Sequence, residues 1–177
     1  LRALALGGAG ESKAAAEQAL ALRERLPQLE DRLLFMAGVQ FEKAGELAGA
    51  ERAFAAVAAT SLLHPQARLG LARVQRAAGR PEEALAALEP VAALPEPDAG
   101  DDWGAQALWT RAELAAELRD GKAARRALLD LWSDHPRSPL SKKAGSRLEA
   151  IPLEVRVARA ERLVRAHHNQ TAIAELA

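Results

Sequence analysis

The 177-residue chain contains no cysteine and no tyrosine, and only 3% of its residues are aromatic. The lack of cysteine excludes a disulfide framework, a cysteine-ligated zinc site and a thiol nucleophile. It does not identify the compartment, because a secreted protein need not carry cysteine. The sequence also lacks any run of 18 or more apolar residues, so it offers no candidate for a membrane-spanning helix.

An excess of charge is lacking as well, since 24 Lys and Arg stand against 24 Asp and Glu. General electrostatic binding to nucleic acid or to anionic membranes therefore gets no support. The hydrophobic fraction of 49% is too high for a disordered chain. Alanine and leucine, which occur 43 and 28 times, are strong helix formers, whereas β-branched residues are sparse. We therefore expect an all-α protein.

A pattern of small and apolar residues recurs after 34 positions. The residues Gly38, Phe41, Gly45, Ala50, Phe54 and Val57 are matched by Ala72, Gln75, Gly79, Ala84, Leu88 and Val91, and only Gln75 changes character. This spacing is the period of the tetratricopeptide repeat, which consists of two helices and a turn. We expect Gly38 to let a partner helix approach closely, and Gly45 and Gly79 to end first helices in the left-handed conformation.

Two later units follow at longer spacings. The third lies 40 positions after the second, because of the turn-rich loop 95–102, and the fourth lies a further 48 positions on, after a short extra helix. The predicted repeat units are 11–28, 31–64, 65–98, 101–138 and 153–177, with the extra helix at 139–149. About ten helices are expected, at 11–26, 29–43, 47–61, 66–78, 81–93, 102–118, 121–134, 139–149, 153–166 and 169–177.

These helices predict one domain over 1–177, a right-handed α-solenoid of antiparallel helix pairs with a concave side. Ser12 is expected to cap the first helix. The chain begins without methionine and stops inside a helical pattern, so we interpret it as a piece of a longer protein.

Histidines and aspartates are the candidates for metal binding or acid–base chemistry. His64 and His135 each precede a proline, which favours the end of a helix over a ligand role. His167 and His168 are adjacent and would point about 100° apart on a helix, so a turn or solvent position is favoured. The aspartates of the loop could hold a cation, but a solvated loop with an Asp cap for the helix near Trp103 is the preferred interpretation. The aspartates of this loop are Asp98, Asp101 and Asp102. We thus expect no catalytic, cofactor-binding or metal-binding residue and no cofactor.

The tryptophans at 103, 109 and 132 are expected mainly to pack between helices. Trp109 is the exception, because it follows Leu108 and points away from the buried face. By helical phase, the concave groove would be lined by Phe35, Val39, Leu69, Arg73, Arg76, Trp109 and Glu113. Such a groove fits a peptide or a partner helix. The alternative is that these residues are covered by another part of the same protein.

The repeats between Leu33 and Leu94 resemble tetratricopeptide repeats. The resemblance is carried by small and apolar residues of both units: Gly38, Phe41, Gly45, Ala50 and Phe54, then Ala72, Gly79, Ala84 and Leu88. The resemblance implies protein binding or a scaffold role. The family's clamp for C-terminal carboxylates uses Lys and Asn on the first helices. Here those inner positions carry Phe35, Val39, Leu69 and Arg73, which argues against an adaptor for chaperone tails.

The second half, from about residue 100, is similar to the N-terminal helical superhelix of soluble lytic transglycosylases. The similarity is carried by the segments 134–139, 151–154, 159–163 and 172–176, with Ala144 and Leu148 between them. In that family the superhelix is non-catalytic and precedes a lysozyme-like domain that cleaves peptidoglycan with one glutamate. Nothing in this chain matches the catalytic domain, so no glutamate here inherits that role.

Two functions follow as hypotheses. The first is a non-catalytic scaffold of a bacterial lytic transglycosylase, located in the periplasm or cell envelope and positioning a separate catalytic domain on peptidoglycan or on partner proteins. The second is a stand-alone tetratricopeptide adaptor that binds a protein segment in its groove. Neither requires nucleic acid or a membrane span, and the chain lacks the convergent titratable groups that an enzyme acting alone needs.

Overall fold

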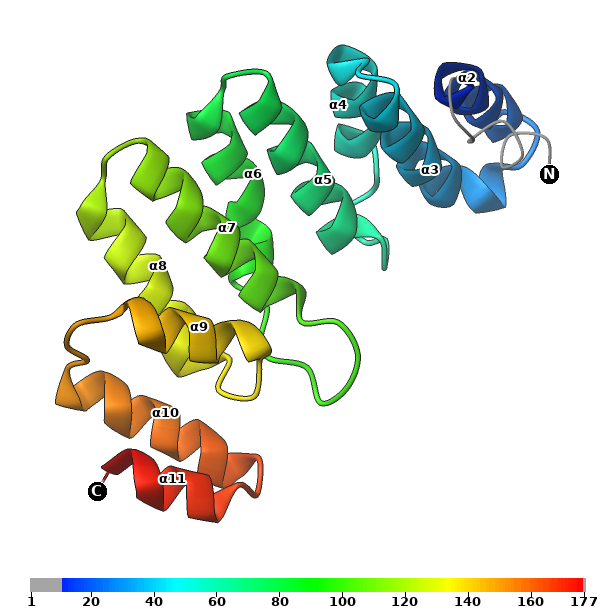
Figure 1. Cartoon of the computed structure of the whole chain (residues 1–177). Coiled ribbons are helices and arrows are strands. Elements are labelled where there is room, and N and C mark those ends of the chain that lie inside the picture. Colours follow the sequence, from blue (N-terminus) through cyan, green and yellow to red (C-terminus); the bar gives the residue numbers. More distant parts are fainter. Residues whose placement is uncertain (1–10, 177) are drawn as a thin grey trace. The chain divides into compact units, whose positions relative to one another are not determined.

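The computed structural model describes residues 11–176, and within them the chain forms ten α-helices and one short 3-10 helix, with no strand. The predicted all-α class is therefore confirmed for the described residues (Figure 1). Ala177, the predicted end of the last helix, lies outside them. The helices are α2 (Ser12–Arg23), the 3-10 helix Pro27–Leu29, α3 (Glu30–Lys43), α4 (Leu47–Ala55), α5 (His64–Ala77), α6 (Pro81–Ala92), α7 (Trp103–Glu117), α8 (Gly121–Asp134), α9 (Pro139–Arg147), α10 (Leu153–Arg165) and α11 (Asn169–Leu176).

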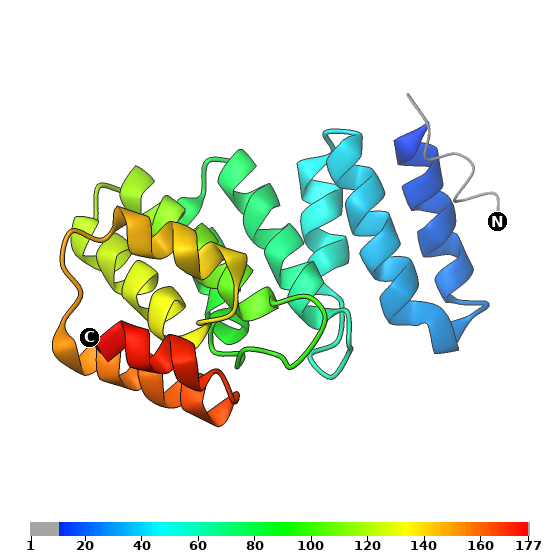
Figure 2. The ribbon, with the colours of Figure 1, turned by 60° about the horizontal axis from the view of Figure 1, so that its bottom comes forward.

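The helices belong to two compact units, the first ending at Ala87 and the second beginning at Leu88, so that α6 contributes to both. In the first unit, α2 packs on α3, α3 on α4, and α4 on α5. In the second, α7 packs on α8, α8 contacts both α9 and α10, and α10 packs on α11 (Figure 2). The single domain and the right-handed solenoid stay predictions.

The same turn ends the first helix of the two pairs in which the repeat period was found. Gly45 and Gly79 both have φ of +75°, in the left-handed region where glycine carries no Cβ penalty. The next N–H group in each case reaches back five positions, from Glu46 to the Phe41 carbonyl and from Arg80 to the Gln75 carbonyl, both at 2.9 Å. This is the Schellman arrangement, which satisfies carbonyls at the end of a helix.

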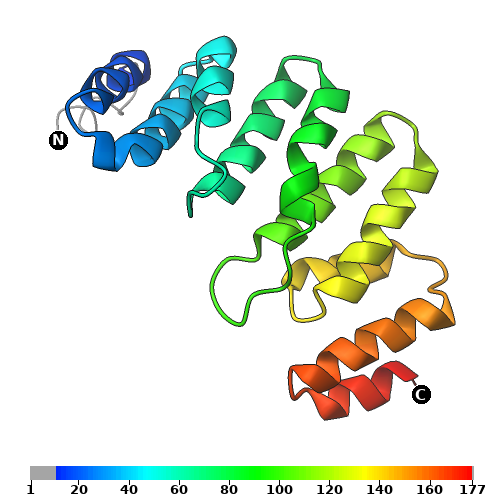
Figure 3. The same ribbon diagram turned by 180° about the vertical axis from the view of Figure 1, so that it is seen from behind.

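The turn recurs twice more without glycine. Arg119 and His167 have φ of +58° and +62°, and the following N–H groups again reach back five positions, at 2.9 and 2.8 Å. The four left-handed residues, at 45, 79, 119 and 167, are therefore separated by 34, 40 and 48 positions. These are the spacings predicted from the sequence. Each turn joins two helices that run in opposite directions, as Figure 3 shows for α7 and α8.

Small residues let the helices of the first unit approach the ring of Phe54, which is 1% exposed. A Cβ atom on Gly38 would lie 2.6 Å from this ring, and one on Gly70 would lie 2.7 Å from it. The close approach predicted at Gly38 is confirmed. Phe35 also meets Phe54, with 5.8 Å between ring centroids. In the second unit, Trp132 is buried beside Gly145, where a Cβ atom would lie 2.9 Å from the indole.

Three local predictions were wrong. The helix predicted at 47–61 ends at Ala55, since the Ala58 N–H donates to the Asp31 carboxylate at 3.0 Å and the chain turns there. His64 begins α5 instead of ending a helix, because a proline is tolerated in the first turn. Ser12 is the first residue of α2 and not its cap; the cap position is held by Glu11, which makes no side-chain capping bond.

Candidate functional site

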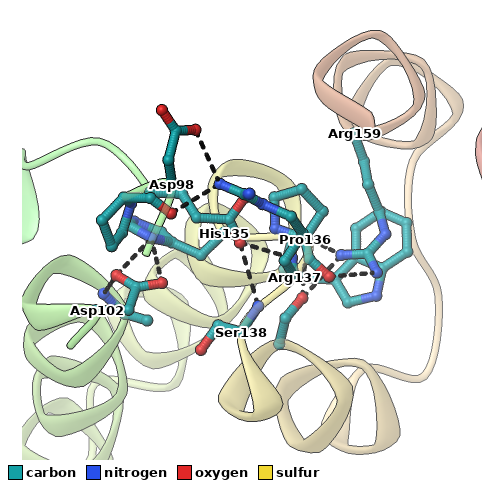
Figure 4. A network of polar contacts seen from close by, with 12 residues as sticks. Asp98, Asp102, His135, Pro136, Arg137, Ser138 and Arg159 are labelled. Atoms are coloured by element: carbon teal, nitrogen blue, oxygen red, sulfur yellow. Dashed lines mark hydrogen bonds and ion pairs between the residues drawn. The ribbon is translucent and has the colours of Figure 1, made fainter. Parts of the chain in front are cut away.

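Polar groups of the second unit gather where the loop 95–102 meets the turn 135–138 (Figure 4). The loop lies between the left-handed turns at 79 and 119, and the turn 135–138 lies between those at 119 and 167. Both intervals are longer than the first interval of 34 positions. The sequence placed them in separate insertions and did not predict that they touch. In the structure they are joined by two carboxylates, one from each end of the loop.

Asp102 is the first of these carboxylates. It caps α7, since the Ala105 N–H donates to its Oδ1 at 2.9 Å, which confirms the predicted Asp cap. The same carboxylate lies against His135, with Nδ1 2.9 Å from Oδ1 and 3.0 Å from Oδ2. His135 follows α8 directly and is 1% exposed. The pair thus fastens the start of α7 to the end of α8.

Gly104 makes room for this pair. A Cβ atom at Gly104 would lie 2.6 Å from Cε1 of His135 and 2.5 Å from the Leu94 carbonyl oxygen. A contact with backbone cannot be relieved by turning a side chain. The approach of the imidazole and of the incoming loop to α7 therefore requires glycine at this position.

Glu96 is the second carboxylate and is buried against the turn, with its side chain 11% exposed. Its Oε1 accepts from the backbone N–H groups of Arg137 and Ser138, at 2.6 and 3.1 Å. Its Oε2 accepts from Arg137 Nε at 2.8 Å, and Arg137 Nη2 donates to the Pro97 carbonyl at 2.7 Å. The hydrogen bond to Glu96 raises the pKa of Arg137 above its ordinary value, so this cation stays charged.

Arg159 of α10 reaches into the same region from the other side (Figure 4). Its guanidinium lies 4.4 Å above the Trp132 ring and donates to the Trp132 carbonyl and to Ser141 Oγ. Its Nε donates to the Glu175 carboxylate at 2.8 Å. One side chain, only 7% exposed as a residue, therefore connects α8, α9, α10 and α11. Its donors face acceptors on each of the other three helices.

A polar cleft of about 470 Å³ opens beside this network and is lined by residues 92–96, by Asp98, and by residues from the end of α8, the turn after it and the end of α10. Two ion pairs lie within its wall: Arg137 with Glu96, and Arg162 with Asp134 at 2.8 Å. The His135–Asp102 pair has the carboxylate–imidazole arrangement that orients a catalytic base. With His135 1% exposed, however, its imidazole is held inside the protein, and its evident role is to join helices.

The predicted groove residues fall into two sets, one in each unit. In the first, Phe35 and Val39 are half-buried on α3 and Leu69 is buried on α5, with 7% exposure. Arg73 is exposed and makes a two-pronged ion pair with Glu42, with both N–O distances 2.9 Å. Arg76 is exposed on the same helix. Leu69 is thus covered, while the two arginines face solvent.

In the second unit, the predicted residues Trp109 and Glu113 contact each other, since the indole Nε1 donates to the Glu113 carboxylate at 2.9 Å. Arg147 of α9 lies over the indole ring, 4.2 Å from its centroid. Trp109 is half-buried as a result, and one face of the ring is occupied by a cation from the same chain. A ligand that stacks on this face would have to displace Arg147.

The other histidines and aspartates hold separate positions. His167 occupies a left-handed turn, as predicted for the His167–His168 pair. Asp101 is exposed, and Asp98 lies 3.7 Å from Arg137. Among the residues that the structure describes, no three His, Asp or Glu side chains gather as a metal site requires. Asp98, Asp101 and Asp102 therefore do not converge on one point, and Asp102 is engaged by His135 and the start of α7.

Sequence reasoning missed Glu96, Arg137 and Arg159 as parts of one network. The signal for Arg159 was an arginine in the apolar phase of α10, directly before Ala160 and one turn before Leu163. The signal for the contact at Asp102 was Gly104. A glycine in the first turn of a helix that already has an Asp cap indicates that another segment approaches closely there.

Comparison of the chain with family models, with curated proteins and with solved structures found no match. Among residues 11–176, no helix has both the length and the apolar character needed to cross a bilayer.

Proposed function

We infer that this chain is a non-catalytic helical-repeat scaffold that binds a segment of another protein. The observation that carries the proposal is the left-handed turn at Gly45, Gly79, Arg119 and His167, which ends the first helix of four successive helix pairs. Repeated helix pairs that stack on one another build extended surfaces, and such arrays serve recognition more than chemistry. A right-handed solenoid with a concave side is the arrangement that this proposal requires.

The use of the charged groups supports a scaffold. Asp102 accepts from the start of α7, Glu96 accepts from the turn 135–138, and Arg159 donates to α11, all within the second unit. In the first unit, Glu51 of α4 likewise accepts from Arg80, at 2.5 and 3.0 Å, and from Gln75 of α5 at 3.3 Å. Ionisable groups that are bonded in this way make each unit rigid, and a rigid surface binds with a smaller entropic cost.

The binding residues that we propose lie on the first helices of the pairs. On α3 and α5, the half-buried apolar Phe35 and Val39 lie on the predicted inner phase together with the exposed Arg73. On α7 they are Trp109 and Glu113. Apolar surface beside arginine fits a segment that has apolar anchors and an acidic residue. Arg73 would exchange its exposed pairing with Glu42 for such a carboxylate at little cost, because exposed ion pairs contribute little.

The test is selection of peptides from a displayed library on the intact chain, followed by titration of the selected peptides against variants. We expect convergent peptides that carry a carboxylate, with affinity at least about tenfold weaker for Arg73→Glu or Trp109→Ala. The matched control is Leu62→Glu, an exposed position in the loop before α5, which should bind as the wild type does. Failure to select any convergent peptide, or equal binding by all variants, would contradict the proposal.

A narrower proposal is that the scaffold belongs to a bacterial peptidoglycan lytic transglycosylase and acts in the periplasm or cell envelope. Its support is the order of segments between residues 134 and 176, which resembles the helical superhelix of those enzymes. In the structure, Arg159 of the segment 159–163 is hydrogen-bonded to two of the other segments, through the Pro136 carbonyl and the Glu175 carboxylate. The test is co-sedimentation of the purified chain with isolated peptidoglycan sacculi, alongside the reading frame of the parent gene. Sedimentation no greater than that of an unrelated helical protein, and a parent without a lysozyme-like domain, would leave the adaptor as the function.

A further inference from the structure

The last helix pair carries an unusual amount of exposed apolar surface. Among the described residues, ten large apolar side chains are exposed, and half of them lie on α10 and α11. Ile173 is 71% exposed, Val164 52% and Leu176 50%. These residues line a shallow groove of about 450 Å³ between the two helices. Monomeric proteins seldom leave contiguous apolar surface of this kind uncovered.

The equivalent surface of the earlier pairs is covered. The residue nine positions after the left-handed turn is Phe54, Leu88 and Leu128 in the first three pairs, with exposures of 1%, 0% and 8%. In the last pair this residue is Leu176, which is 50% exposed. In the first unit, the element over Phe54 is a helix, α5, which approaches with the small residue Gly70. The apolar groove of the last pair is therefore not covered by any of the described residues.

The charges at the groove are self-complementary. Glu161 and Arg165 lie one turn apart on α10, in the same face as Val157 and Val164, and both line the groove. A two-fold axis through the groove would bring Glu161 next to the partner subunit's Arg165 and would form this contact twice. A zero net charge adds no repulsion between copies.

We propose that this groove is the interface of a symmetric dimer, in which the α10–α11 faces of two copies pack on each other with α10 antiparallel to the partner's α10. The face is small: α10 is about 20 Å long and two helices are about 20 Å wide. Packing two such faces together buries roughly 800 Å² in total, which is less than most stable interfaces bury, so we expect a weak dimer with a Kd of about 10 µM or above. The proposal concerns assembly and does not depend on whether the scaffold binds a protein segment.

The first experiment is sedimentation of the intact chain from about 1 to about 200 µM. We expect a concentration-dependent shift from monomer to dimer. Ile173→Glu should weaken dimerisation at least about tenfold, because a carboxylate would be buried in an apolar groove. Leu62→Glu, at an exposed leucine of the other unit, is the matched control and should leave the equilibrium unchanged. Ile173 is exposed in the monomer, so helicity by circular dichroism should be the same in both variants.

The second experiment tests the register through charge reversal. Glu161→Arg and Arg165→Glu should each weaken self-association, because like charges would then face each other across the axis. The double variant should restore it. An equimolar mixture of the two single variants should form heterodimers more readily than either forms homodimers. The proposal would be overturned by a chain that stays monomeric over the whole range, by a dimer that is indifferent to Ile173→Glu, or by charge reversals without rescue.

Discussion

The recurring turn leads to a prediction with opposite signs at two equivalent positions. Gly79 and Arg119 both end a first helix with positive φ, at +75° and +58°. A side chain costs about 1–2 kcal/mol in this conformation. Replacing glycine also recovers about 0.4–1 kcal/mol, because the unfolded chain becomes less flexible. Gly79→Ala should therefore lower the free energy of unfolding by about 1 kcal/mol, and Arg119→Gly should raise it by about 0.5–1 kcal/mol.

Packing does not complicate this estimate, since a Cβ atom on Gly79 would meet nothing within 4 Å and Arg119 is exposed. The assay is urea unfolding followed at once by circular dichroism and by tryptophan fluorescence. All three tryptophans lie in the second unit, so fluorescence reports on Arg119 and dichroism on both units. Gly121→Ala is the matched control, because this glycine is helical and has open space around it. Alanine there should raise the free energy of unfolding by up to about 1 kcal/mol. A destabilised Arg119→Gly together with an unchanged Gly79→Ala would refute the equivalence of the turns.

Three further predictions concern the contacts between helices. Gly70→Ala should cost about 1–3 kcal/mol in urea unfolding, because its Cβ would lie 2.7 Å from the Phe54 ring and the tightly packed ring has little room to move. Arg159→Met keeps much of the volume over Trp132 but removes the donors, so it should lower the fluorescence-detected stability by about 3 kcal/mol. The hydrogen bond from Arg80 lowers the pKa of Glu51, so this pair stabilises the protein above the unfolded pKa of Glu51 and loses that effect as pH falls through the lower folded pKa. Glu51→Gln should therefore flatten the acid limb of a stability–pH curve measured by thermal unfolding.

Each of these has its own counter-result. Gly70→Ala as stable as the wild type would mean that α5 does not press on Phe54. The control for Arg159→Met is Arg126→Met, an arginine on α8 whose side chain is 80% exposed and which should change stability by less than about 0.5 kcal/mol. Equal effects of the two would remove the special role of Arg159. An acid limb that is the same in Glu51→Gln and wild type would show that the Glu51–Arg80 pair does not link stability to pH.

The helical architecture was largely accessible from the sequence because it depends on local rules. The repeat period placed Gly45 and Gly79, and the longer spacings of the two later units placed the next two turns. Those turns hold Arg119 and His167, residues that no glycine rule would have chosen. The Asp102 cap was also predictable, since an acceptor before a helix start satisfies a free N–H group.

The polar network was not predictable, because its members come from distant segments. His135 and Asp102 lie 33 positions apart, and Arg137 and Glu96 lie 41 apart. Each looks by itself like an ordinary surface residue, and only the folding of the loop 95–102 onto the turn 135–138 brings them together. The end of α4 was missed for a related reason. The carboxylate of Asp31, which lies on the preceding helix, accepts a hydrogen bond from the Ala58 N–H.

The central proposal is that the first helices of the pairs carry the residues that bind a protein segment. The most direct measurement is hydrogen–deuterium exchange of the intact chain with and without a peptide selected on it. The account predicts added protection on α3, α5 and α7, around Arg73 and Trp109, and little change on α4 and α8. Protection confined to α4 and α8, or no protection at a saturating peptide concentration, would contradict it.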